Sequence, residues 1–422
     1  MGLLALNGGT PVRRGGWPDW PQSSDATRRN LDAVLASHRW SISGQYRGEH
    51  SWEQRFADAF ADFTDARCCV PAATGTASLT IALEACGVGA GDEVIVPGVT
   101  WVASASAVLG INAVPVLTDV DPATGCLDPD AVARAITPRC RAVTVVHLGS
   151  AVADLDALLA VTARHGIPLI EDCAQAHGAR YKDRHVGRFG AAGTFSMQHS
   201  KLLTSGEGGA VITDDPVLAR RVAHLRADGR TFSATPPAMD DMELVETAEI
   251  MGSNHCLSEF HAAILLAQME KLPRETARRA ASAARLDVLL RGLGCSPQET
   301  AAGTTMRAYY SYVVRLPATL TQVVGIKRAA AALSAELGLP CKPMYASLDR
   351  NPLYNPASRR RFALGDRFLA AVRPDSFALS AASDFSRCCI SLPHRLLLAE
   401  PDEMQQVADA FAKVIAHGAE LA

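Results

Sequence analysis

Between residues 68 and 213 the sequence alternates short apolar runs with longer segments of helical periodicity. The short runs are rich in Val and Ile and are bounded by turn residues, which is typical of buried strands. Strands that alternate with helices predict an α/β fold, in which helices cover both faces of a mostly parallel sheet. We expect strands at 68–71, 93–97, 114–117, 142–146, 168–172, 191–197 and 210–213, with helices at 78–85, 103–109, 127–135, 155–165 and 216–226.

The 422 residues are enough for two lobes. Residues 1–50 contain several Gly and Pro and predict an N-terminal arm with one helix at 25–38. Residues 51–290 are expected to form the large domain, which includes a polar loop at 228–241 and ends in one long helix from about 257 to 290. Beyond residue 304 the pattern changes to a half-exposed strand at 309–316 and a helix at 325–337. Residues 291–422 are therefore expected to form a smaller α+β domain.

Polar residues follow several of the expected strands. In open parallel sheets ligands bind at the carboxyl ends of the strands. The convergence of these residues on one edge therefore predicts a ligand site there. The residues are Thr74, Gly75, Thr76, Thr100, Trp101, His147, Asp172 and Ser196.

A single lysine, Lys201, lies between the strand at 191–197 and a glycine-rich turn at 206–209. An amine held between two strands is shielded from water, which disfavours its charged form and favours attack on a carbonyl. Ser196, five residues earlier, can bind an anionic group. A lysine near an anion ligand suggests pyridoxal 5'-phosphate held as a Schiff base.

The remaining parts of such a cofactor site can be assigned provisionally. A phosphate fits the N-terminus of the helix that follows Gly75 and Thr76. The pyridine nitrogen needs a carboxylate, and either Asp172 or Glu171 could supply it, but the two alternate across a strand and only one can face the site. Trp101 offers a ring to stack on the cofactor, and Gln175 can bond its ring hydroxyl.

The composition excludes other classes of protein. A net charge of −3 gives no electrostatic reason to expect a nucleic-acid or membrane partner. No apolar segment approaches the roughly 20 residues of a membrane span, and the N-terminus lacks the basic region of a signal peptide. The eleven cysteines contain no Cys-x-x-Cys, and the histidines show no metal spacing. We therefore expect no metal site, no disulfide framework and a cytoplasmic location.

The sequence resembles the DegT/DnrJ/EryC1/StrS family of sugar aminotransferases over nearly its whole length. The resemblance is carried by TGTA at 74–77, GDEVIVP at 91–97, EDCAQAHG at 171–178, Ser196 with Lys201 and EGG at 207–209, GSN at 252–254, and LSE at 257–259. It implies the fold-type I architecture of aspartate aminotransferase, with Lys201 as the Schiff-base lysine and Asp172 as the partner of the pyridinium. It also implies that Asn254 reaches the phosphate of the neighbouring subunit, in a homodimer with shared active sites.

Segments 17–22, 39–44 and 397–401 look like the cyclitol branch of that family. This resemblance implies transfer of an amino group from L-glutamine, or glutamate, to a cyclitol ketone such as 2-deoxy-scyllo-inosose or scyllo-inosose in aminoglycoside biosynthesis. A nucleotide-linked keto-sugar aminotransferase, a 3-amino-5-hydroxybenzoate synthase and a non-catalytic relative remain alternatives. The sequence departs from the branch at His147, His255, Asp349 and Pro393, where substrate contacts are expected. The candidate substrate contacts are Ser43, Tyr345, Asp349 and His394.

Overall fold

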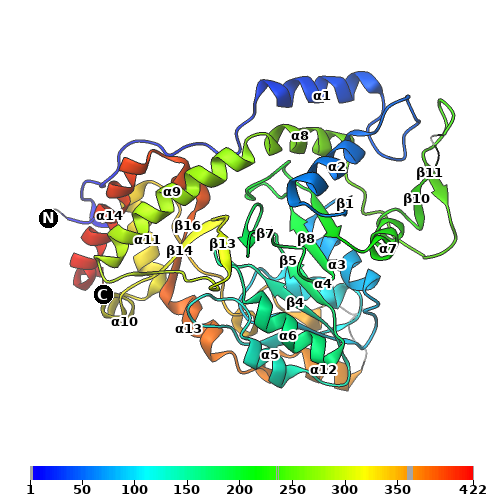
Figure 1. Ribbon diagram of the computed structural model, residues 1–422. Coiled ribbons are helices and arrows are strands. Elements are labelled where there is room, and N and C mark those ends of the chain that lie inside the picture. The colour runs from blue at the N-terminus through cyan, green and yellow to red at the C-terminus, as the bar shows by residue number, and fades with distance from the viewer. Residues whose placement is uncertain (1–2, 234, 236, 359–364, 422) are drawn as a thin grey trace.

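The computed structural model describes residues 3–233, 235, 237–358 and 365–421, and a seven-stranded sheet lies at its centre (Figure 1). The strand order is β1-β9-β8-β5-β4-β2-β3. All neighbours from β8 to β3 pair in parallel, and β9 is antiparallel to both of its partners. The predicted, mostly parallel α/β sheet is confirmed. Its strands are β1 Cys68–Ala72, β2 Glu93–Pro97, β3 Val114–Thr118, β4 Cys140–Val146, β5 Leu169–Asp172, β8 Ala192–Ser196 and β9 Gly209–Thr213.

The connecting helices begin where short polar side chains can cap them. Thr74 accepts a hydrogen bond from the Ala77 N–H at 3.0 Å, and Asp154 accepts one from the Ala157 N–H at 3.1 Å. Such caps satisfy N–H groups that have no partner within the helix. Six helices lie close to their predicted positions: α1 Asp25–Ser37, α3 Gly75–Ala85, α4 Ala103–Gly110, α5 Pro129–Ala135, α6 Leu155–His165 and α7 Pro216–Arg226. A further helix, α2 Trp52–Thr64, precedes β1.

The single long helix expected from 257 to 290 is wrong, because the chain forms two helices there, α8 Glu259–Met269 and α9 Leu272–Arg291. Pro273 falls in the first turn of α9, where a missing N–H costs nothing, whereas inside one continuous helix it would remove a hydrogen bond. The polar loop expected at 228–241 is partly wrong as well. Its residues include β10 Arg230–Phe232, which pairs antiparallel with β11 Leu244–Glu246.

The second half of the chain builds a four-stranded antiparallel sheet in the order β12-β14-β16-β15. A separate apolar core joins it to α9, and Leu4 and Trp17 of the N-terminal arm are buried in that core. The elements of this half are β12 Ser296–Pro297, β14 Ser311–Arg315, β15 Lys342–Pro343, β16 Cys389–Pro393, α10 Ala318–Val324, α11 Ile326–Leu337, α12 Asp366–Val372, α13 Ser380–Cys388 and α14 Met404–Ala416. A small three-stranded sheet contains β6 Arg180–Tyr181, β7 Arg184–His185 and β13 Thr304–Met306.

The two halves meet at the carboxyl edge of the large sheet. Met344, Leu348 and Phe385 come from the second half, yet they are buried in the same apolar core as Ile95 and Val143 of the large sheet. This packing brings the start of β14 and the end of β16 over the edge where the predicted ligand residues lie. The domain boundaries at about 50 and 290 stay predictions. Among the described helices, none has an apolar stretch long enough to cross a bilayer.

Candidate active site

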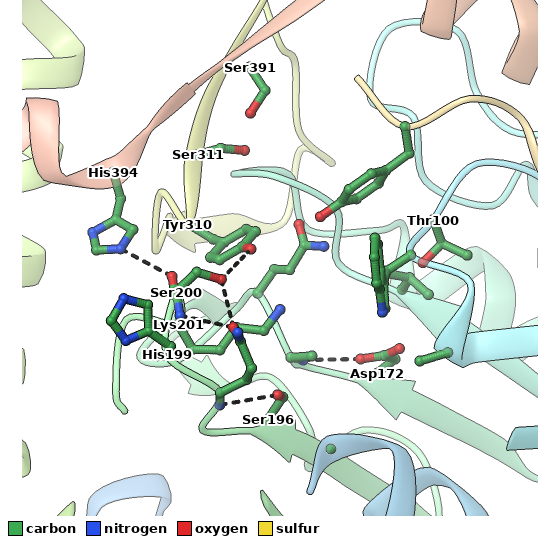
Figure 2. A pocket seen from close by; sticks show the side chains of 18 of the residues that line it. Thr100, Asp172, Ser196, His199, Ser200, Lys201, Tyr310, Ser311, Ser391 and His394 are labelled. Carbon is green, nitrogen blue, oxygen red and sulfur yellow. Dashed lines mark hydrogen bonds between the residues drawn. The ribbon is translucent and has the colours of Figure 1, made fainter. Parts of the chain in front are cut away.

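A cavity of about 840 Å³ lies where the two halves meet (Figure 2). One wall is the carboxyl edge of the large sheet, and the other wall comes from residues 310–311, 340–345 and 391–395. Eleven of the residues predicted to bind a ligand line this single cavity: Thr74, Gly75, Thr76, Thr100, Trp101, Asp172, Gln175, Ser196, Lys201, Tyr345 and His394.

Asp172 ends β5 and points into the cavity (Figure 2). Its side chain accepts a hydrogen bond from Ser104 Oγ at 3.0 Å and another from the Ala174 N–H at 3.1 Å. Burial raises the pKa of this carboxyl, although both hydrogen bonds and the charge of Lys201 act in the opposite direction. The surrounding residues therefore do not fully stabilise the ionised carboxylate, and a cationic ligand group in the cavity would stabilise it.

Glu171, the competing carboxylate, faces away from the cavity. It accepts hydrogen bonds from the N–H groups of Gly187 and Phe189, each at 2.7 Å, and of Gly190 at 2.8 Å. These bonds satisfy a fully buried charge and hold the turn before β8. The alternation along β5 thus leaves Asp172 as the only one of the two that can serve the site.

His147 was expected to face the ligand, and this expectation is wrong. It is buried behind the sheet edge, with Nδ1 accepting a hydrogen bond from the Ala153 N–H and Nε2 lying 3.2 Å from Glu171. His147, Glu171 and Cys173 offer possible metal ligands within 4.8 Å of one another in the described part of the chain. The backbone donors already engage the carboxylate, so we assign this cluster to folding.

The N-terminus of α3 forms a cradle against Ser196. A Cβ atom added at Gly75 would lie 2.4 Å from Ser196 Cβ, so only glycine allows this close approach. The first N–H groups of a helix point outward without partners and carry a partial positive charge. Together with the Ser196 hydroxyl they make a site suited to a phosphate.

Lys201 is 9% exposed and lies close to the cradle and to Asp172. Its Nζ lies 4.3 Å from the centroid of the Tyr310 ring. Trp101 is half exposed at the cavity mouth, with its ring centroid 5.9 Å from that of Tyr345. Gln175 accepts the Gly149 N–H through Oε1 at 2.7 Å, which leaves its NH₂ group as the donor available to a ligand.

Besides His147, three residues expected at substrate contacts do not line this chain's cavity: Ser43, His255 and Asp349. Asn254, which was expected to reach the site of the neighbouring subunit, does not line it either. Ser43 and Asn254 are exposed on surface loops, where Ser43 Oγ lies 3.0 Å from Ser41 Oγ and Asn254 Oδ1 accepts the Cys256 N–H. Asp349 lies in the short helix Leu348–Arg350, with its nearest charged atom in Arg350 at 3.7 Å. The family resemblance, and no local pattern, placed these residues near a site. The Asp349 side chain is only 14% exposed but lies outside the cavity lining.

A model of the DegT/DnrJ/EryC1/StrS aminotransferase family matches residues 22–412. The chain belongs to this family. The L-glutamine:2-deoxy-scyllo-inosose aminotransferase of Streptomyces lividus is 58% identical to it over 418 residues, which cover 99% of both chains. The L-glutamine:scyllo-inosose aminotransferase of Streptomyces griseus is 57% identical over 412 residues, or 98% of this chain and 97% of the relative.

The fold agrees with this assignment. The crystal structure of 3-amino-5-hydroxybenzoic acid synthase superposes with a TM-score of 0.80 at 32% identity, covering 96% of this chain and all of that one. The expected aminotransferase architecture is thereby confirmed, and the chain is an aminotransferase.

Several residues that line the cavity of this aminotransferase were not predicted. Except for Ser200, which directly precedes Lys201, they lie far from Lys201 in the sequence, and the start of β14 reads simply as a half-exposed strand, so no local pattern marks them. All of them carry at least one polar side-chain atom. They include Trp20, Ser200, Tyr310, Ser311, Lys342, Ser391 and Arg395.

Proposed function

We propose that this aminotransferase uses pyridoxal 5'-phosphate to move the amino group of L-glutamine to the ring ketone of a cyclitol, with 2-deoxy-scyllo-inosose as the first candidate. The observation that carries the proposal is the sequence identity of 58%, over 99% of both chains, to a relative named for that activity. In agreement with it, Lys201, Asp172 and Ser196 line one cavity of this chain. The similar identity to the scyllo-inosose enzyme makes that ketone the second candidate.

The cavity fits the cofactor at each end. The cradle between Gly75 and Ser196 has the donors and the close approach that a phosphate needs. The carboxyl of Asp172, whose pKa burial raises, gains a partner if a protonated pyridine lies beside it. Trp101 supplies a flat apolar surface for the ring, and the Gln175 NH₂ group can donate to the ring hydroxyl.

When bound, pyridoxal phosphate supplies an electron sink for removing an amino group from one substrate and delivering it to another. The Lys201 amine would hold this group covalently and, once free, would accept and return a proton at its Nζ. Asp172 would hold a proton on the ring nitrogen. Polar groups that line the cavity can bind the hydroxyls of a cyclitol: Ser200 beside Lys201, and Ser311, Tyr345, Ser391 and His394 on the opposite wall.

Replacing Gly75 with Ala is expected to weaken cofactor binding by about ten- to a hundredfold, because the new methyl group must push α3 away from Ser196 at a cost of about 1–3 kcal/mol. A fluorescence titration with pyridoxal phosphate measures the change. Gly89→Ala is the control, since no heavy atom lies within 4 Å of its added Cβ. Equal affinity in both variants would contradict the phosphate assignment.

We further propose a homodimer with shared sites. Asn254 and Ser43 can meet a cavity only if it belongs to a second chain, since both are exposed in this one. Their loops are joined to each other and to the β10–β11 hairpin, through bonds such as Tyr46 N–H to Asp241 O. Large apolar side chains are exposed on the same segments, as expected of a surface that is covered by a partner. They are Trp40, Met242, Val245 and Met251.

Mixing the variants Lys201→Ala and Asn254→Ala is expected to restore activity that each lacks alone. In a mixed dimer one site would combine both defects and the other would be intact. The matched control mixes Lys201→Ala with Asp172→Asn, whose side chains line the same chain's cavity, so no intact site can form. Activity that recovers in neither mixture would count against Asn254 acting across the interface.

The substrate assignment is tested by incubating the loaded enzyme with L-glutamine and one ketone at a time, and identifying the amine by mass spectrometry. We expect amination of 2-deoxy-scyllo-inosose, with scyllo-inosose second. Amination of a nucleotide-linked keto-sugar alone would overturn the cyclitol assignment, and an ultraviolet-absorbing aromatic product would favour the aminohydroxybenzoate synthase alternative. A protein that never binds pyridoxal phosphate would favour the non-catalytic alternative.

A further inference from the structure

Tyr310 comes from the second half of the chain, yet its ring lies against the amine of Lys201 (Figure 2). It stands directly before β14, and the residue before it, Tyr309, has a backbone φ of 56°. This left-handed conformation is uncommon for a bulky residue and tends to occur where a side chain must be aimed at a site. The backbone thus holds the Tyr310 side chain in the cavity.

The Tyr310 hydroxyl is bonded to a serine beside the lysine. It lies 3.1 Å from Ser200 Oγ, which itself donates to Gln198 Oε1 at 2.8 Å. A serine hydroxyl has one hydrogen, and it is used on Gln198. Neutral Tyr310 therefore donates to Ser200, and rotation of the serine hydroxyl would let Ser200 donate to an ionised Tyr310 instead.

The two tyrosines of the cavity differ in their electrostatics. Burial alone would raise the pKa of Tyr310, but the charge of Lys201 and hydrogen bonds involving Ser200, Tyr345 and Lys201 outweigh it and lower that pKa. Burial and the neighbouring Tyr310 hold the pKa of Tyr345 well above its ordinary value. Tyr310 is thus the hydroxyl of the pair that can exchange a proton.

We propose that Tyr310 is the proton partner of Lys201 in the reaction proposed above. The N–H bond of the Lys201 ε-ammonium breaks and an O–H bond forms on the Tyr310 phenolate, which leaves a neutral amine and a neutral phenol. The reverse transfer restores the ammonium. A free amine can then take the proton from the substrate carbon, which an ammonium cannot do.

Other titratable groups near Tyr310 are less suited to this exchange. His394 stacks on the Tyr310 ring at 6.4 Å, but burial holds its pKa well below the usual value and its Nε2 is engaged by the Ser200 carbonyl at 3.2 Å. Asp172 is bonded to Ser104 and the Ala174 N–H. Arg279 is paired with Glu275; burial lowers its pKa to about 10, so it keeps its proton at neutral pH.

The first test is an ultraviolet difference titration of tyrosinate in the full chain, with and without pyridoxal phosphate. We expect one tyrosine of the cofactor-free protein to ionise below its ordinary pH range, that signal to vanish in Tyr310→Phe, and the same ionisation to move to higher pH in Lys201→Ala. Tyr181→Phe is the matched control, because Tyr181 is buried outside the cavity and its pKa is raised to about 12. The proposal would be overturned if the tyrosinate signal persisted in Tyr310→Phe, or if its midpoint pH were the same in Lys201→Ala as in the wild type.

The second test separates proton transfer from a structural role. With L-glutamine deuterated at Cα, Tyr310→Phe is expected to lower kcat by about 10²-fold, with an increased isotope effect and little change in the affinity for glutamine. A loss of affinity with no change in the isotope effect would mean that Tyr310 only shapes the cavity. The tyrosinate titration needs no substrate, so it remains informative even if the ketone panel shows that the proposed function is wrong.

Discussion

Replacing Lys201 with Ala is expected to abolish the visible absorption band of the pyridoxal phosphate-loaded protein and to reduce transamination by at least about 10³-fold. In the proposed reaction the amine has two tasks, covalent attachment of the cofactor and proton transfer. Among the described residues that line the cavity, the one other lysine is Lys342, on the opposite wall. Absorbance before and after addition of L-glutamine measures the first task, and stopped assays with the ketone measure the second.

Lys342→Ala is the matched control for this experiment. Lys342 lines the same cavity but is exposed, and it belongs to β15 of the second sheet, whereas Ser196 belongs to β8 of the large sheet. We expect the band to persist in this variant and to bleach when glutamine is added. Turnover that survives intact in Lys201→Ala would show that the proposed chemistry is wrong.

Replacing Asp172 with Asn is expected to reduce turnover by about 10²–10³-fold, the usual effect of removing one electrostatic contact to a developing charge. Asparagine keeps the shape, its Oδ1 can still accept from the Ala174 N–H, and its NH₂ group can donate to Ser104 Oγ after rotation of that hydroxyl. The main change is therefore the loss of negative charge. Without that charge the pyridine nitrogen loses its proton, and the ring withdraws electrons less well. Turnover and cofactor affinity are measured together, and normal turnover would rule out the assigned role.

The stability of the cofactor-free protein provides the folding control for Asp172→Asn. Burial raises the pKa of Asp172 in the folded state above the ordinary value of 3.8, so the folded protein binds more protons than the unfolded one as the pH rises past that value. Ionisation of Asp172 therefore lowers wild-type stability at neutral pH. We expect the Asn variant to melt at a higher temperature than wild type at neutral pH, and at the same temperature below pH 3.8, as followed by circular dichroism.

The main elements of the fold could be predicted because their signals are local. The apolar runs that became β2 and β5 are short and bounded by turn residues, and helices such as α6 carry a capping Asp and end at a glycine with φ of 63°. The break between α8 and α9 was missed because the apolar pattern continues across it. Pro273 was the available signal, since proline is favoured in the first turn of a helix.

In the candidate site, too, some residues could be placed from local patterns and others could not. Lys201, Asp172 and Ser196 each follow a strand of the same sheet, and parallel strands present their carboxyl ends at one edge, so the sequence could bring them together. The direction of His147 could not be predicted, because it depends on the Ala153 N–H and the Glu171 carboxylate, which only packing brings near.

The sequence by itself therefore determined the α/β architecture, the family and the residues along the sheet edge, since the alternation of strands and helices is written in short-range patterns. Only the tertiary structure decided which residues form the opposite wall. Tyr310 and Ser391 reach the cavity because β14 and β16 pair with each other and because residues such as Phe385 are buried in the core of the large sheet. These contacts join segments that lie more than a hundred residues from Lys201. They form because apolar surface is buried between those segments, and such burial leaves no periodic pattern in the sequence.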